Sequence, residues 1–170
     1  MQEDRLEEFF EGVVVKNSLI LEELYTLSSD VGTRGLFGKE RVAGSGIETS
    51  ILYALVKCIE SCINESSNIN DDISIKCVSI LGQIANHPDN RKALVSGDVD
   101  KKLNLLDLLV SILNDCNGED DASIDINNEN VATAVTTRRE LLCTPILELL
   151  LTLAGDETNK VCMIHTEWLL

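Results

Sequence analysis

Aromatic side chains and proline are scarce in this chain: aromatics make up 4% of the 170 residues, and there are 2 prolines. Aliphatic side chains must therefore fill whatever core the protein builds. No apolar run reaches the roughly 18 residues that a membrane-spanning helix needs, so we expect no membrane insertion. A hydrophobic content of 44% with 25% charged residues excludes collagen-like and wholly disordered classes. A single domain over 1–170 is expected for this length.

Positive charge is also in short supply. The chain has 14 Lys+Arg against 29 Asp+Glu, which gives a formal net charge of −15. Because such a surface repels phosphate, we predict no nucleic-acid binding and favour basic or neutral protein partners.

No secretion signal is recognisable, because the first residues, 1–8, are acidic and lack a cationic segment followed by an apolar one. We therefore expect a cytoplasmic protein with reduced thiols that mostly pack as small core hydrophobes. The six cysteines are Cys58, Cys62, Cys77, Cys116, Cys143 and Cys162.

Apolar residues recur every three or four positions, which is the helical period, and no stretch alternates as a half-buried strand would. The sequence therefore predicts an all-α protein. The segments with this period are 19–27, 51–63, 73–84, 105–113 and 146–154. The expected stripe of the last segment is Ile146, Leu147, Leu150, Leu151 and Ala154.

Helix boundaries are indicated by proline and glycine. Thr144 followed by Pro145 resembles an N-cap with proline at the first helical position, which predicts a helix start there. Pro88 is predicted to end the helix before it, and Gly12 and Gly97 are predicted to mark stops or turns.

Three segments are expected to be flexible loops: 30–46, 60–72 and 114–130. The first is rich in glycine, with room for one short helical turn. The other two are acidic and lack Lys and Arg, and they bury too little apolar area to offset the entropy of ordering. They are interpreted as solvated loops or, alternatively, as binding loops for a basic partner.

One pattern occurs three times without gaps, at 24–37, 81–94 and 150–163. In each copy a Leu lies three residues before a Leu or Ile, and a small residue follows. A basic residue comes seven positions after the Leu or Ile, and an apolar residue three further on. The basic residues are Arg34, Arg91 and Lys160, and the apolar ones are Phe37, Leu94 and Met163.

The middle copy, with the sequence IANHPDNRKALVSG over 84–97, resembles the junction between helices of an armadillo repeat. The resemblance implies a right-handed α-solenoid of about three armadillo-like repeats, each covering the apolar face of the one before. Spacings of 57 and 69 residues between copies exceed the family period of about 40–47, so the acidic segments would be loop insertions. Residues 167–170 would only begin a next long helix, which implies a fragment of a longer solenoid. A compact Leu-rich bundle is the alternative architecture.

Peptide-binding armadillo proteins carry a Trp and an Asn, four apart, on the long helix that lines their concave groove. This chain has other residues at those places, so the resemblance implies docking of a folded partner or a helix instead of an extended peptide. The neighbouring Leu24, Leu81 and Leu150 are expected to face the core. The candidate partner-binding residues are Glu22, Thr26, Ser79, Gln83, Glu148 and Thr152.

No motif for catalysis or for cofactor binding is complete. Gly38-Lys39 is followed by Glu40, which cannot supply the hydroxyl that a phosphate loop needs. Cys58 and Cys62 are four apart on one helical face, but a closed zinc site needs two further ligands, so core packing is favoured over a metal or redox role. We predict no catalytic residues, no metal and no cofactor.

The function predicted from these patterns is that of a non-enzymatic, protein-binding scaffold. One alternative follows from acidic loops and Gly155-Asp156-Glu157, which resemble the armadillo-type dissociation stimulators of small GTPases with polybasic tails. A small GTPase or a basic segment would then be the partner. The other alternative is a helical subunit that supports an enzyme on a partner chain.

Overall fold

The computed structural model describes residues 3–41, 44, 46–64, 68–99, 103–117, 129–156 and 159–160. Within these ranges the chain is mostly helical and has no strand, which confirms the predicted all-α class. An isolated antiparallel bridge joins Glu40 to Ser50. In the same ranges, no helix combines the length and the apolar character needed to cross a bilayer.

The helices are α1 (Glu3–Val14), α2 (Ser18–Ser29), α3 (Val31–Arg34), α4 (Ile51–Asn64), α5 (Asn68–Ile84), α6 (Pro88–Val99), α7 (Leu105–Asn117) and α8 (Glu129–Ala154), with a 3-10 turn η1 (Ile47–Thr49) before α4.

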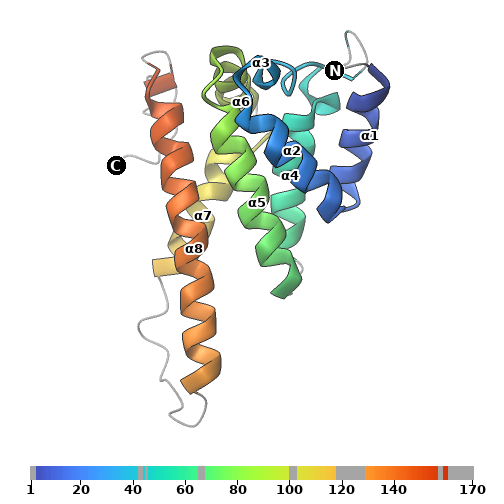
Figure 1. Ribbon diagram of the computed structural model, residues 1–170. Coiled ribbons are helices and arrows are strands. Elements are labelled where there is room, and N and C mark those ends of the chain that lie inside the picture. The colour runs from blue at the N-terminus through green and yellow to red at the C-terminus, as the bar shows by residue number, and fades with distance from the viewer. Residues whose placement is uncertain are drawn as a thin grey trace.

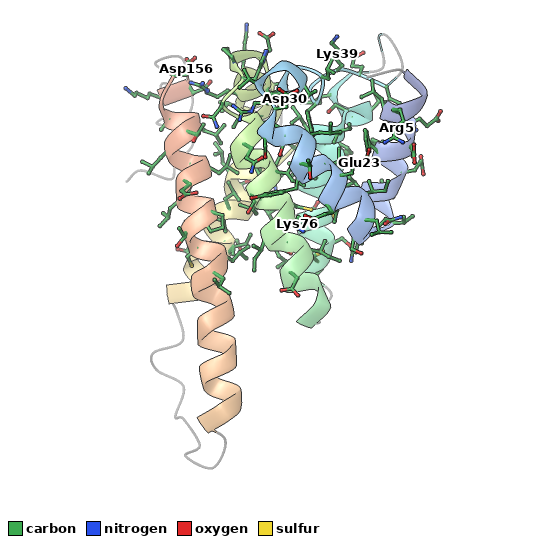
Figure 2. All side chains as sticks on the ribbon, in the orientation of Figure 1. Arg5, Glu23, Asp30, Lys39, Lys76 and Asp156 are labelled. Atoms are coloured by element: carbon green, nitrogen blue, oxygen red, sulfur yellow. The ribbon has the colours of Figure 1, made fainter. Side chains whose placement is uncertain are left out.

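Helices α2, α5 and α8 lie side by side in a row, with α5 packed against both of the others (Figure 1). All three run in the same direction, so their carboxyl ends lie at one end of the molecule. Behind the row, α4 packs against α5, and α7 packs against α8. Helix α1 packs against both α2 and α4 at the other edge. Arg5 of α1 also pairs with Glu23 of α2 (Figure 2).

The core between these rows is aliphatic, as the scarcity of aromatic residues predicts. Leu24 and Leu81 are fully buried, which confirms that they face the core, and Leu150 packs against the core while partly exposed. Burial of each such side chain stabilises the fold by roughly 1.5–3 kcal/mol. The buried Cys58 and Cys77 belong to the same core, as predicted.

The carboxyl ends of the three row helices are capped in one recurring way. The last carbonyls of a helix have no donor within the helix and need one from elsewhere. In each copy of the sequence pattern, a polar side chain six residues further on donates to such a carbonyl. The pairs are Thr33 with Leu27, Asn90 with Ile84 at 3.1 Å, and Asn159 with Leu153 at 3.1 Å.

The basic residues of the pattern act beside these caps. Arg34 Nε donates to the carbonyl of Ser28 at 2.8 Å, and Arg91 Nε donates to the carbonyl of Ala85 at 3.0 Å, again six residues back. The apolar residues that follow, Phe37 and Leu94, are fully buried, whereas Met163 lies outside the described residues. The sequence pattern therefore corresponds to shared contacts in its first two copies.

Two of the predicted loops are largely helical where the structure describes them. Helix α4 continues to Asn64 and α5 begins at Asn68, so the prediction of a loop over 60–72 is wrong for those parts. In 114–130, α7 continues to Asn117 and α8 begins at Glu129, while 118–128 lie outside the described residues. Tertiary packing of the apolar face extends a helix into a polar end that local composition does not favour. Segment 30–46 holds the short α3, as expected.

Both glycines predicted to stop helices lie inside them: Gly12 in α1 and Gly97 in α6. Gly12 serves a close approach instead, because a Cβ built there would lie 2.6 Å from side-chain carbons of Ile20 in α2. The missing side chain lets α1 and α2 pack together.

The two prolines behave differently. Helix α5 ends at Ile84 and α6 starts at Pro88, which confirms the predicted boundary. The predicted helix start at Thr144-Pro145 is wrong, because α8 runs through both residues. Pro145 has no N–H to donate to the carbonyl one turn earlier, but packing of α8 against α5 and α7 keeps the helix continuous.

The buried side of α8 is also displaced from the predicted stripe. Leu147 and Leu151 are 51% and 73% exposed. Ile146 is fully buried as predicted, and Leu149 and Leu153, which the stripe did not include, are fully buried beside it. The helical period determines which residues share one face of a helix. It does not determine which face the neighbouring helices cover.

Candidate interaction surface

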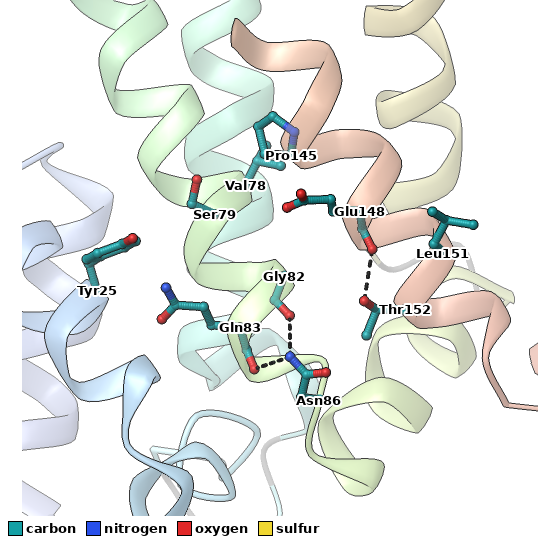
Figure 3. A pocket seen from close by; sticks show the side chains of 10 residues that line it. All are labelled: Tyr25, Val78, Ser79, Gly82, Gln83, Asn86, Pro145, Glu148, Leu151 and Thr152. Atoms are coloured by element: carbon teal, nitrogen blue, oxygen red, sulfur yellow. Dashed lines mark hydrogen bonds between the residues drawn. The ribbon is translucent and has the colours of Figure 1, made fainter.

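A groove of about 480 Å³ lies between α5 and α8, on the face formed by the row of helices (Figure 3). Its floor comes from α5, its wall from α8, and Tyr25 of α2 closes the opposite side. The lining residues are Tyr25, Val78, Ser79, Gly82, Gln83, Asn86, Pro145, Glu148, Leu151 and Thr152. Four candidate positions predicted from the sequence, Ser79, Gln83, Glu148 and Thr152, meet there.

The floor of the groove is low because Gly82 has no side chain. A Cβ built on Gly82 would meet nothing within 4 Å, so the space above it is open. Asn86, one turn later, donates from Nδ2 to the carbonyls of Gly82 and Gln83, each at 3.2 Å. These bonds hold the amide of Asn86 against the end of α5 (Figure 3).

Gln83 connects the floor to α2. Its Oε1 accepts hydrogen bonds from the hydroxyls of Ser28 and Ser29, the latter at 3.1 Å. Ser28 is fully buried, so this link is part of the packing between α2 and α5. Gln83 therefore holds the groove's floor in position next to Tyr25. Its side-chain oxygen, Oε1, already accepts hydrogen bonds from the two serines.

The wall of the groove presents one acid. Glu148 extends from α8 toward α5 and makes no ion pair with any described residue (Figure 3). Thr152 turns inward, because its hydroxyl donates to the backbone carbonyl of Glu148 at 2.8 Å. With Pro145 and Leu151 nearby, the wall combines a carboxylate with apolar surface.

A second hollow, of about 290 Å³, lies between α2 and α5 and contains Glu22. Glu22 forms an ion pair there with Lys76, whose Nζ lies 5.8 Å from the ring centroid of Tyr25. Leu19 at its edge is 79% exposed, although the helical period placed it in the apolar stripe of its segment. Thr26 lines neither hollow; its hydroxyl donates to the carbonyl of Glu22 at 3.0 Å.

Sequence reasoning missed the residues that shape the groove. Tyr25, Gly82 and Leu151 occupy the same position of the repeated pattern, one residue before Thr26, Gln83 and Thr152. That shared register was visible in the sequence and could have identified them. Pro145 was noticed only as a helix start, and its place in the wall depends on the unpredicted continuation of α8.

The buried thiols lie in the core, behind the row of helices. A hydrogen bond from Cys62 lowers the pKa of Cys58, but a hydrogen bond involving Cys77 and burial outweigh it and raise that pKa to about 12. The hydrogen bond with Cys58 and burial raise the pKa of Cys62 well above its ordinary value. Where side chains are described, no group of three or more His, Cys, Asp or Glu is arranged to hold a metal ion.

Neither a protein-family model, nor a curated protein, nor a solved structure matches this chain. The candidate surface is therefore interpreted from its own residues.

Proposed function

We propose that this chain is a non-enzymatic, protein-binding scaffold built as an α-solenoid of armadillo-like repeats. In this proposal the helix pairs α1–α2, α4–α5 and α7–α8 are the repeats, stacked in a right-handed superhelix. The packing of α2 on α5 and of α5 on α8 supports it. So do the side-chain caps that recur at Leu27, Ile84 and Leu153.

The groove between α5 and α8 is the proposed partner site, and the observation that carries this proposal is Gly82. Glycine inside a helix costs about 1 kcal/mol relative to alanine. At Gly12 this cost is offset because the missing side chain lets Ile20 of α2 pack closely against α1. At Gly82 a Cβ would have open space, so no such contact offsets the cost. No contact within the described chain requires glycine there, so room for a partner supplies the reason.

The chemistry of the groove describes that partner. Glu148 lacks a cation among the described residues, and Leu151 and Pro145 beside it offer apolar contact. A partner element that brings Lys or Arg next to an aliphatic side chain would match both. The net charge of −15 would attract it over a distance.

The experiment uses a photo-crosslinking amino acid placed at Ser79 in the groove. The matched control places it at Ser111, an exposed serine of α7 outside the groove. In cell extract we expect a defined protein to crosslink from position 79 and not from position 111. Raising the salt concentration should weaken this capture if Glu148 receives a cation.

Two arginine variants complete the test. Ser79→Arg should block the groove and abolish capture, while Ser111→Arg should leave capture unchanged. Circular dichroism and thermal unfolding of both variants establish that each remains folded. Equal crosslinking from the two positions, or capture that survives Ser79→Arg in a folded protein, would contradict the proposal.

A further inference from the structure

Where side chains of α8 are described, two leucines on the side that points away from α5 are exposed. Leu147 and Leu151 lie one turn apart on this helix and are 51% and 73% exposed. Figure 3 shows Leu151 on the edge of α8 that lies farther from α5, at the rim of the groove. Two leucines this exposed on adjacent turns form a continuous apolar strip, which marks an interaction surface more often than a scattered single residue does.

The repeated pattern shows what covers this strip elsewhere in the molecule. Leu21, Val78 and Leu147 occupy one position of the pattern, three residues before Leu24, Leu81 and Leu150. Leu21 is 1% exposed and lies at the junction of α2 with α5. Val78 is fully buried and faces Pro145 of α8 across the groove.

A second position follows the same order. Ser28 of α2 and Ala85 at the end of α5 are fully buried, whereas their equivalent in α8, Ala154, is partly exposed. In both series, a helix of the row covers the helix before it. Leu147 thus occupies a position that is covered twice elsewhere in the fold, whereas the position of Leu151 stays open in α2 and α5 as well, at Tyr25 and Gly82.

We infer that the strip formed by Leu147 and Leu151 binds an amphipathic helix of another protein, laid along α8 as α8 lies along α5. The aliphatic stripe of that helix would cover the two leucines, and Lys or Arg beside the stripe would face Glu148. This surface shares Leu151 with the rim of the proposed groove but extends beyond it, because Leu147 does not line the groove.

A basic partner helix fits this strip better than a second copy of the chain. Each copy carries a net charge of −15, so two copies repel each other. Helix α1, at the opposite edge of the fold, offers a copy no surplus of positive charge, because Arg5 pairs with Glu8 and Arg41 pairs with Glu7 and Glu11. A helix with Lys beside its leucines gains attraction where a copy meets repulsion.

The test uses a synthetic peptide with leucines at helical spacing (i, i+3, i+4, i+7) and lysines flanking that stripe. One control peptide has the same composition with the leucines shuffled out of register, and another has glutamate in place of lysine. Binding is measured by fluorescence anisotropy against the full chain. The protein variants are Leu147→Gln and, as the matched control, Val31→Gln, since Val31 is 73% exposed and lies in α3, which packs against α2.

We expect the striped lysine peptide to bind, and Leu147→Gln to weaken it about tenfold or more, the loss that uncovering one leucine produces. Val31→Gln should change nothing. Failure of the striped peptide to bind would overturn the inference. Equal binding of the shuffled peptide would also overturn it, because that peptide keeps the lysines but has no aliphatic stripe, so charge alone would explain the binding.

Two further measurements separate this surface from its alternatives. Ser79→Arg, which blocks the groove, should weaken helix binding less than Leu147→Gln does, because an arginine there competes for Glu148 but leaves Leu147 available; if it abolishes binding, the helix occupies the groove and the strip on α8 is not the site. Sedimentation velocity of the protein alone should show a monomer. A dimer that Leu147→Gln dissociates would assign the strip to a second copy and overturn the inference.

Discussion

The side-chain amide of Asn90 joins two copies of the sequence pattern: its Nδ2 donates to the backbone carbonyl of Arg34 at 2.6 Å and to that of Ile84 at 3.1 Å. Asn90 is 1% exposed, so no water replaces these bonds if they are lost. The carbonyls belong to the ends of α3 and α5, which hold the first and second copies of the pattern. A single buried amide thus fixes how these two copies meet.

The substitution Asn90→Asp should destabilise the fold by about 1–3 kcal/mol, since it removes the donor and turns a carboxylate oxygen toward two carbonyls. Asn86→Asp is the control, because Asn86 makes similar bonds on the exposed side of the same turn. Urea unfolding measures both. Equal losses for the two variants would show that the buried link contributes nothing special.

The pair Gly82→Ala and Gly12→Ala should have effects of opposite sign on stability. Both glycines lie inside helices, where alanine is favoured by about 1 kcal/mol. Gly82 has room for a Cβ, so its alanine variant should unfold at higher urea concentration. At Gly12 the Cβ would clash with Ile20, at a cost of about 1–3 kcal/mol. A stability loss for Gly82→Ala would show that the glycine has a structural role after all.

The buried thiols should make the fold sensitive to alkali. Cys58 has a pKa of about 12 in the fold against an ordinary 9.0, so the folded state disfavours its thiolate. The stability that this difference supplies is complete below pH 9.0 and is lost as pH rises through 12. Cys62 shifts in the same direction. We expect the urea concentration at the midpoint of unfolding to decrease when the pH is raised from about 8 to about 11. The decrease should be larger in the wild type than in a Cys58→Ala, Cys62→Ala variant.

Alkylation provides a second measurement of the same thiols. At neutral pH the native Cys58 and Cys62 should react with iodoacetamide far more slowly than in urea, because the thiolate is the reactive form. Cys143, which is partly exposed, serves as the internal comparison. Mass spectrometry of digested protein reads each site separately. Fast native labelling of Cys58 would contradict its protonated, buried state.

Much of the fold follows from local pattern. The helical period predicts the helices around Leu24, Leu81 and Leu153, and the Leu–Arg spacing identifies segments that share contacts in the structure. What the pattern leaves out is tertiary: Asn90 carries no local signal that its amide also reaches the carbonyl of Arg34, 56 residues earlier in the chain. The same holds for α8, where the local meaning of Pro145 favours a helix start and packing against α5 decides otherwise.

For the candidate site too, the sequence predicts which positions come together but not the contacts that they make. Matching positions in the copies of the sequence pattern point to Ser79, Gln83, Glu148 and Thr152, and these four residues line one groove. The pattern could not show that Gln83 is engaged by Ser28, or that Glu22 pairs with Lys76 in a separate hollow, because both depend on how the helices cross. The partner-binding role of these residues stays a prediction.

Equivalent leucines should differ in what they contribute to stability. Leu21 and Leu147 hold the same position of the pattern, but one is 1% exposed and the other 51%. Leu21→Ala should therefore cost about 2–5 kcal/mol, the range for a buried leucine. Leu147→Ala should cost about 0.5 kcal/mol or less, as exposed substitutions do. Urea unfolding of the two variants at matched protein concentration decides it: comparable losses would mean that Leu147 is already covered in the isolated chain, and that the interface series ends at α8.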